Sequence, residues 1–308
     1  MAQQVIESQP VVVLDKLRKP TSEWQRARHS LIKARWPILA LVIIGFVAFV
    51  AIFGPSFAPK DPNRQNLILR LKPPMTQERD GSVEFILGTD ALGRDVLSRL
   101  IYGAQISLMV GFAAVAIGGT LGTILGLLAG YFGGVIDDVI MRVADIQLAF
   151  PFILLVIMVL VVLGSGIPNL VVVLGVGQWV TYARIARGGT ISQREKEYIE
   201  AARCLGTKDS RIMFGNILPN ILAPLIVLAS FNVASVILAE ASLSFLGLGV
   251  PPTVPTWGGM LAESRDQLLA GSWWLAVFPG LAIMFTVLSL NILGDWLRDF
   301  LDPRLRGK

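Results

Sequence analysis

Residues 100–136 read LIYGAQISLMVGFAAVAIGGTLGTILGLLAGYFGGVI, a run without a single Asp, Glu, Lys or Arg. A helix that crosses a membrane needs about 20 mostly apolar residues, and this run exceeds that length. We expect its span to begin near Ser107. The whole chain shares this character, because 54% of its residues are hydrophobic and only 16% are charged; soluble domains have about 25% charged residues. The sequence therefore predicts an all-α protein that lies in a lipid bilayer.

Further apolar stretches bring the expected number of membrane spans to six. The stretch 146–183 is long enough for two spans, broken at the turn residues 164–169. Single spans are expected at 36–59, 212–239 and 267–294. The expected organisation is a tail at 1–35, a first span at 36–58, an outer segment at 59–104, a five-helix core at 105–294 with a polar segment at 190–219, and a tail at 295–308.

The lysines and arginines give the orientation. With both chain ends in the cytoplasm, 19 of the 27 basic residues fall in inner segments and 8 in outer ones, as the positive-inside rule requires. The polar segment then also faces the cytoplasm. The net charge of +5 is thus a sign of topology and does not indicate nucleic-acid binding. The first 35 residues are too long and too mixed for a cleaved signal peptide, so we expect the first span to remain as an anchor.

Few residues offer chemistry of their own. Cys204 is the only cysteine, which excludes an internal disulfide, and His29 lies in a basic tail. The sequence shows no metal cluster, no nucleophile–base pair and no Gly-x4-Gly-Lys-Ser/Thr phosphate loop. Residues 206–208 read Gly-Thr-Lys, but they lack the first glycine and the terminal hydroxyl residue of that loop. We therefore expect no catalytic residue, no metal and no ATP bound by this chain.

The polar segment has the local signals of a helix–turn–helix. Ser192 and Glu195 have the spacing of a capping box, and Gly206 stands where a left-handed residue would end the first helix. Thr207 is a candidate N-cap for a second helix, with Asp209 in its first turn. An ordered polar segment on the cytoplasmic side of a membrane protein indicates a docking site for another protein. The plain alternative is a solvated amphipathic loop.

This segment resembles the EAA loop of binding-protein-dependent ABC importers, which docks a permease onto its ATPase. The family pattern has Glu-Ala-Ala, three residues, Gly, and about nine residues to a hydrophobic-Leu-Pro ending. Asn216 departs from it, because Ile is common there. The matching residues are Glu200, Ala201, Ala202, Gly206, Leu218 and Pro219.

Two helical faces suggest packing roles. Residues 96, 97, 100 and 101 share an apolar face opposite Arg94, Asp95 and Arg99, which predicts a short helix that lies at the outer interface. In the second span, small residues at a spacing of four let a neighbouring helix approach closely. That neighbour can belong to the same chain or to another subunit. These residues are Gly118, Gly122, Gly126 and Gly130.

Charged or aromatic residues mark the ends of other spans. Arg142 and Asp145 lie in a short inner segment that is either a second cytoplasmic contact or a pair of charges at span ends. Trp273 and Trp274 stand where the sixth span begins, and we expect them to be anchors at the membrane interface.

From about Leu87 onward the chain resembles the C-type permease subunit of dipeptide, oligopeptide and nickel ABC importers. The first 86 residues match mainly in layout. The motifs that carry the resemblance are Gly88-Thr-Asp90 with Gly93-Arg94-Asp95, Ala129–Gly134 with Asp137, Met141-Arg142 and Asp145, the EAA segment, Leu243–Gly249 with Pro251-Pro252 and Trp257-Gly258, and Asn291, Gly294-Asp295, Leu297–Asp299 and Leu301–Arg304.

The resemblance implies a type I importer in a bacterial inner membrane. A second, homologous permease would complete the pore, two ATPase subunits would bind ATP and Mg in the cytoplasm, and an external binding protein would deliver the substrate. Peptides are the commonest cargo of such permeases, while nickel complexes, glutathione and opine-like compounds are alternatives.

Polar residues within spans are costly and often functional, so they are the candidates for the pathway. Each of them can instead bond a neighbouring helix. Glu240 could meet a peptide's ammonium group or cap the outer end of the fifth span. The candidates are Gln178, Thr181, Asn232, Ser235, Glu240 and Asn291.

Two other classes of protein fit the sequence less well. A secondary transporter or channel that acts alone would need ion-binding carboxylates at mid-membrane, and the spans hold almost none. An intramembrane enzyme would need a Ser/His, paired Asp or His/Glu group within the spans, which the sequence does not show.

Overall fold

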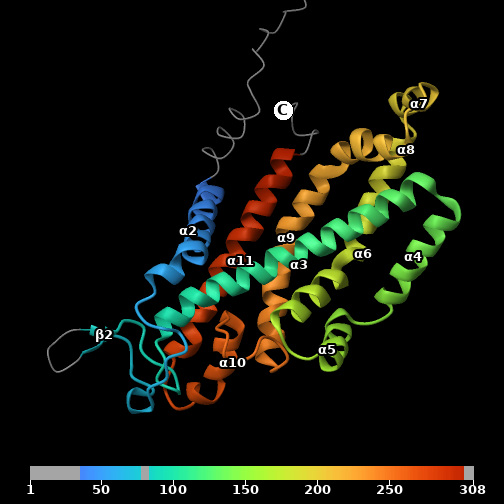
Figure 1. Ribbon diagram of the computed structural model, residues 1–308. Coiled ribbons are helices and arrows are strands. Elements are labelled where there is room, and N and C mark those ends of the chain that lie inside the picture. Colours follow the sequence, from blue (N-terminus) through green and yellow to red (C-terminus); the bar gives the residue numbers. More distant parts are fainter. Residues whose placement is uncertain (1–34, 78–82, 302–308) are drawn as a thin grey trace, which may run out of the picture.

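The computed structural model describes residues 35–77 and 83–301, so His29 and residues 302–308 lie outside it. The described chain is a bundle of long helices (Figure 1). A small antiparallel pair, β1 (Thr76–Gln77) and β2 (Val83–Phe85), lies in the outer segment after η1 (Leu67–Leu69). The helices are α2 (Arg35–Phe57), α3 (Val96–Phe132), α4 (Gly134–Leu148), α5 (Phe152–Leu163), α6 (Ile167–Arg194), α7 (Glu197–Cys204), α8 (Asp209–Arg211), the π-helix η2 (Ile212–Ile217), α9 (Leu218–Phe245), α10 (Trp257–Leu268) and α11 (Trp274–Leu301).

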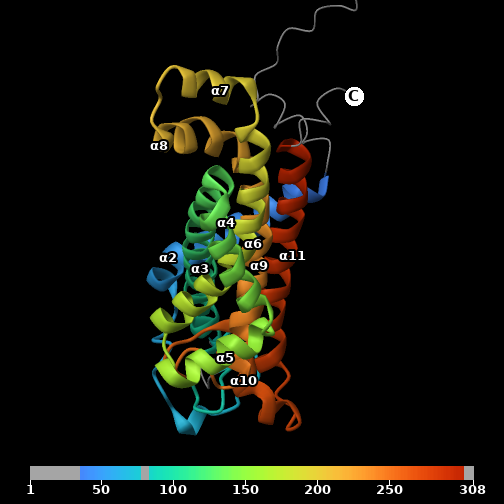
Figure 2. The same ribbon diagram turned by 90° about the vertical axis from the view of Figure 1, so that its right-hand side faces the viewer.

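The small elements lie at the two ends of the bundle. Figure 1 and Figure 2 show α7 and α8 at one end, where α11 also ends. At the opposite end lie α10 and the β1–β2 pair. The charge distribution predicts that residues 190–219 and the C-terminal end lie on the same side of the membrane. The structure places α7, α8 and the end of α11 at the same end of the bundle. Which end faces the cytoplasm stays a prediction.

Fewer of the described helices are long and apolar enough to cross a membrane than the six spans expected from the sequence. Among the described residues, four helical segments are long and apolar enough to cross a membrane: α2, α3, residues 209–245 and α11. The pair α4 and α5, bent by 88°, would make a fifth. The remaining expected span coincides with α6, which has 28 residues but carries Arg184 and Arg187 in its second half.

The helix expected at the outer interface does not exist as a separate element. Asp95 caps the helix by accepting the amide N–H of Ser98 at 2.8 Å, and α3 then runs without interruption from Val96 to Phe132. The stretch between Ser98 and the apolar run holds no helix breaker, so the helix continues into the span. The polar face that was expected to meet solvent is instead buried, because it forms ion pairs.

A cluster of four charged side chains joins the start of α3 to α10. Asp90 accepts from Arg94 Nε at 2.6 Å and from Arg99 Nη1 at 3.2 Å. Glu263 of α10 accepts from the same arginines at 2.6 and 3.1 Å. Burial raises the pKa of Glu263 to about 7, against the opposing effect of Arg94. Buried charges need such pairing, so the cluster fixes the outer segment to α10.

The glycine stripe of α3 packs against α6 within the same chain. Gly118, Gly122, Gly126 and Gly130 are all buried. A Cβ added at Gly118 would meet the carbonyl oxygen of Gly175, and one at Gly126 would meet that of Ala183. The two helix backbones therefore touch directly, as small residues at a spacing of four allow. The structure places the stripe at an intramolecular contact.

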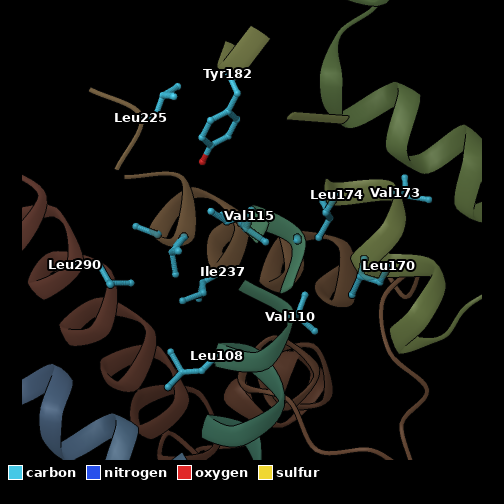
Figure 3. Packing of buried hydrophobic residues seen from close by; sticks show 14 of the residues in the cluster. Leu108, Val110, Val115, Leu170, Val173, Leu174, Tyr182, Leu225, Ile237 and Leu290 are labelled. Atoms are coloured by element: carbon cyan, nitrogen blue, oxygen red, sulfur yellow. The ribbon is translucent and has the colours of Figure 1, made fainter. Parts of the chain in front are cut away.

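The apolar core lies around α3, where α6 and α9 pack against it. Figure 3 shows Leu108, Val110 and Val115 of α3 with side chains of the neighbouring helices. These include Leu170, Leu174 and Tyr182 of α6, Ile237 of α9 and Leu290 of α11. Most of the large apolar side chains that remain exposed lie on helices that are candidates for contact with lipid.

The two tryptophans before α11 have different surroundings. Trp273 is 50% exposed, as expected of an interface anchor, whereas Trp274 is buried. The Trp274 indole Nε1 donates to the carbonyl oxygen of Thr89 at 3.2 Å. Trp274 therefore holds the outer segment in place, and its assignment as an interface anchor was wrong. Residues 257–268, which begin with the motif residues Trp257-Gly258, form α10.

Gly122→Leu tests the contact between α3 and α6. The new side chain would meet the carbonyl oxygen of Trp179 and the Cβ of Tyr182, so we expect a loss of at least about 2 kcal/mol of stability from overpacking. Thermal unfolding of the detergent-purified protein measures this. Gly45→Leu on α2 is the control, because an added Cβ there meets no atom within 4 Å. Equal effects of the two substitutions would contradict the assignment.

The raised pKa of Glu263 predicts that the stability of the protein depends on pH. Its pKa is about 7 in the folded protein and 4.5 as an unperturbed group, so between these values the folded state binds more protons than the unfolded state. The free energy of unfolding contributed by Glu263 therefore rises as the pH falls from 7 to 4.5. We expect the melting temperature of the wild type minus that of Glu263→Gln to increase on acidification. A decrease would mean that the arginines dominate.

Candidate functional site

The polar segment forms three short elements between α6 and α9. The expected capping box is absent: Ser192 lies in the last turn of α6, and α7 begins after Lys196 without a side-chain cap. The helix α6 extends past Ser192 to Arg194. Its last residue is held by α3, because the Arg194 guanidinium donates to the carbonyl oxygen of Tyr131 at 3.0 Å.

The turn between α7 and α8 follows the sequence more closely. Gly206 has a φ of +72°, which confirms the expected left-handed residue, and its N–H donates to the carbonyl oxygen of Arg203 at 2.9 Å. Asp209 lies in the first turn of α8, as expected. The cap was wrongly placed at Thr207, because α8 begins one residue later, after Lys208, and no side chain caps it.

The helix α7 has one buried face and one exposed face. Ile199 is fully buried and belongs to the core cluster together with Ile212 and Met213. On the other side, Glu200 is exposed and Leu205 is 86% exposed. The exposed side of the segment thus presents a carboxylate on α7 and an apolar side chain at its C-cap, Leu205.

The six residues of the EAA pattern divide between these faces. Ala202 and Leu218 are half-buried and pack against the core cluster. The other four are exposed on the same segment: Glu200, Ala201, Gly206 and Pro219.

Tyr131, which the sequence analysis did not single out, connects four helices at this end of the bundle. It lies in the last turn of α3, and its hydroxyl donates to Asp209 Oδ1 of α8 at 2.5 Å. The guanidinium of Arg203 on α7 lies 5.2 Å from the centre of its ring. Together with the bond from Arg194 of α6, these contacts fix the segment to the end of α3. The signal in the sequence was its place in the motif Ala129–Gly134.

A second set of bonds ties α7 to both helices that flank it. The Tyr198 hydroxyl donates to Gln193 Oε1 of α6 at 2.8 Å. The side-chain amide of Asn220 on α9 donates to the Tyr198 oxygen at 3.3 Å. Tyr198 therefore links α7 to both α6 and α9.

Arg142 and Asp145, the two residues of the expected second cytoplasmic contact, lie on α4 in different surroundings. Arg142 is exposed, while Asp145 accepts from Arg184 of α6 at 2.7 Å across an exposed ion pair. A further pair, missed in the sequence, joins Asp137 to Arg187 through two bonds of 2.5 Å. Asp137 and Asp145 of α4 thus hold it against α6, while Asp138 and Arg142 are exposed and form no ion pair among the described residues.

The polar residues of the spans do not all lie together. Gln178, Thr181 and Ser235 line one hollow between α4, α6 and α9, whereas Asn232 and Asn291 are half-buried and outside its lining.

Glu240 is fully buried in this chain and accepts from Ser244 Oγ at 2.8 Å and from Ser107 Oγ at 3.4 Å. It lies inside α9, which ends at Phe245, so it neither caps the helix nor lines the hollow. Its bonds hold α3 and α9 together.

Comparisons with known proteins decide the family. The family described as "Binding-protein-dependent transport system inner membrane component" matches residues 122–307, more than half of the chain. The chain belongs to this family. Residues 22–74 match the "N-terminal TM domain of oligopeptide transport permease C". The resemblance to C-type permease subunits is therefore confirmed, and the all-α membrane permease fold with it.

Named relatives are similar over nearly the whole permease. It is 42% identical over 284 residues to the di/tripeptide transport system permease protein DppC of Pseudomonas aeruginosa, with 92% of each chain covered. It is 41% identical over 309 residues to the glutathione transport system permease protein GsiD of Escherichia coli O157:H7, with 99% and 97% covered.

A solved structure shares the fold. A chain of the MetNI methionine ABC transporter, in an inward-facing conformation, superposes with a TM-score of 0.53 at 19% identity. The match covers 66% of the permease and 97% of that chain.

Tyr131→Phe tests the attachment of the segment. Loss of the hydroxyl leaves Asp209 without its 2.5 Å partner, and a lost hydrogen bond to a charged group is worth about 1.5–3 kcal/mol. We expect amide hydrogen exchange in residues 197–211 to become at least about tenfold faster. Tyr102→Phe, near the other end of α3, is the control and should leave this exchange unchanged. An unaltered rate in the Tyr131 variant would contradict the role.

Proposed function

We propose that this chain is one of two permease subunits in an ATP-driven, binding-protein-dependent importer of peptides. It forms half of the translocation pathway and receives its motion from cytoplasmic ATPases through α7. The observation that carries the proposal is the exposed face of α7 with Glu200, followed by the exposed C-cap residue Leu205. The buried Ile199 supports this helix, and Tyr198 links it to α6 and α9.

The fixed turn after α7 supports this role. Gly206 ends the helix in a left-handed conformation, and no neighbouring atom lies within 4 Å of a Cβ built there. The space beside its Cα is therefore open, and a partner surface can approach the backbone there. Closure of two ATPases around ATP and Mg would then move α7 as a rigid body and change the angle between α6 and α9.

The cargo follows from the relatives. Those most similar are named as di/tripeptide, dipeptide and glutathione permeases, and glutathione is itself a peptide. We therefore infer a di- or oligopeptide, delivered by an external binding protein. The second permease subunit, the bacterial inner membrane and the cytoplasmic position of both chain ends belong to the same proposal. The chain itself binds neither ATP nor nucleic acid in this proposal and catalyses no reaction.

Glu200→Lys tests the docking face. The change reverses a charge on an exposed side chain and leaves the buried face of α7 intact, so folding should be unaffected. In the reconstituted importer, we expect peptide-stimulated ATP hydrolysis and uptake to fall at least about tenfold, as the loss of a charged contact predicts. The control is Glu195→Lys, an exposed residue of the same segment just before α7.

Two results would refute the proposal. Normal uptake and ATP hydrolysis in Glu200→Lys would remove α7 from the docking contact. Peptide transport by the purified chain in vesicles, with no partner and no ATP, would instead indicate a stand-alone transporter or channel.

A further inference from the structure

A cavity of about 280 Å³ lies at the junction between α10 and the segment that leads into α3. This junction is at the end of the bundle opposite to α7 and α8 (Figure 1). Small-molecule sites in proteins usually have about 300 to 1,000 Å³, so this cavity has room for a molecule of a few heavy atoms. Part of its wall is apolar, and the residues of that part are Ala91, Leu92, Val96, Pro252, Met260 and Leu275.

The polar part of the wall is the cluster of Asp90, Arg94, Arg99 and Glu263, together with Ser264. Arg94 and Arg99 are each more than nine-tenths buried. Both carboxylates of the cluster bind each of these arginines, so the guanidinium groups are held in place. The cavity therefore has two fixed cations at its wall, next to an apolar surface.

These guanidinium groups have donors to spare. A guanidinium has five N–H groups. Arg94 uses Nε and Nη2 for the two carboxylates, and Arg99 uses Nη1 and Nη2 for the same two. Arg94 Nη1 and Arg99 Nε donate to no described residue, and neither belongs to the inaccessible polar atoms that lack a partner. Both nitrogens therefore keep accessible surface beside the cavity.

The charge balance of the cluster favours an anion. Two guanidinium groups carry two positive charges, and Asp90 offsets one of them. Glu263 offsets the second only while it is ionised. Burial raises the pKa of Glu263 to about 7, the charge of Asp90 adds to the rise, and Arg94 opposes it. Near neutral pH the cluster is therefore between neutral and singly positive, and arginine binds carboxylates through parallel N–H bonds.

Glu263 is the group of this cluster that changes its charge near neutral pH. The groups that face it are Arg94 and Arg99, with Asp90 bound to both. The other charged side chains on α10 and on the helices packed against it are the exposed Arg265 and Asp266 of α10, the capping residue Asp95 before α3, Glu240 of α9, which bonds to two serines, and the charges within 295–299 at the far end of α11.

We propose that this cavity is a binding site for a small aliphatic carboxylate, whose oxygens accept from Arg94 Nη1 and Arg99 Nε while its carbon chain contacts Met260 and Leu275. The ligand is a free short-chain acid or the C-terminal end of a peptide, because both present the same group. A bound carboxylate adds a negative charge beside Glu263, so Glu263 takes up a proton when the ligand binds. The site does not depend on the proposed import of peptides.

Calorimetric titration of butyrate into the full chain in lipid nanodiscs tests the site. A simple carboxyl group titrates near pH 4 to about 4.5, so butyrate is ionised at both pH 6 and pH 8, whereas Glu263 changes its protonation between them. We expect binding to be at least about fivefold tighter at pH 6, because the uptake of a proton is coupled to it. Butyramide, which has the same shape without the charge, should not bind.

Glu263→Gln removes the competing charge and keeps the shape of the side chain. We expect this variant to bind butyrate at pH 8 at least about fivefold more tightly than the wild type, and equally well at pH 6 and pH 8. A merely structural role of Glu263 would give weaker binding instead. Glu84→Gln is the matched control, because Glu84 also pairs with a cation of the outer segment, Lys60, but does not line the cavity.

A second variant keeps the test independent of the assembly of Glu263→Gln. Ala91 is half-buried at the wall of the cavity, so Ala91→Leu narrows the site and removes no charge. We expect its affinity for butyrate to fall at least about tenfold, as overpacking predicts. Competition then separates the two sources of the ligand: displacement of butyrate by dialanine, but not by dialanine amide, identifies the C-terminus of a peptide, and no displacement identifies a free acid.

Absence of butyrate binding to the wild type, or equal binding of butyrate and butyramide, would overturn the site. Weaker binding by Glu263→Gln than by the wild type at pH 8, or unchanged binding by Ala91→Leu, would overturn it as well. None of these results bears on the proposed import, which the Glu200→Lys variant tests separately.

Discussion

The backbone contact between α3 and α6 is the constraint on which the rest of the structure depends. Four glycines let the two helices meet without side chains between them, and dispersion forces at this distance replace the hydrophobic effect that a membrane does not provide. The contact sets the position of α6, and hence that of α7 at its end. It also leaves α4 to pack on the remaining face of α6, through the ion pairs of Arg184 and Arg187.

Other parts of the bundle are attached to this pair at both of its ends. At the outer end, the cluster of Asp90, Arg94, Arg99 and Glu263 joins α10 to the start of α3. At the other end, Tyr131 joins α3 to the polar segment. The helix α3 therefore connects both ends of the bundle. The corner between α4 and α5 contacts α6 through the ring of Phe152 on Gly177 and through Gln147, which bonds to Gly177 and Trp179.

Sequence alone predicted the membrane class, a break at residues 164–169, which the structure confines to 164–166, and the left-handed Gly206. Each of these depends on local composition or on one residue type. It failed where tertiary contacts decide. Arg94 and Arg99 have the pattern of a solvated face, yet both are buried, where they pair with the nearby Asp90 and with Glu263 from a distant position. Glu240 has the character of a pathway residue, yet two serines hold it inside the chain. The hollow beside Gln178 depends on the 88° bend between α4 and α5, which periodicity does not reveal.

The π-helix η2 has a consequence for how α9 is set in the bundle. A π turn contains one residue more than an α turn, so everything after Ile217 is rotated by about 100° relative to a regular continuation of α8. This phase determines that Glu240 meets α3 while Ser235 faces away from it. Deletion of a single residue here would make the backbone more regular and would aim every side chain of α9 at the wrong neighbour.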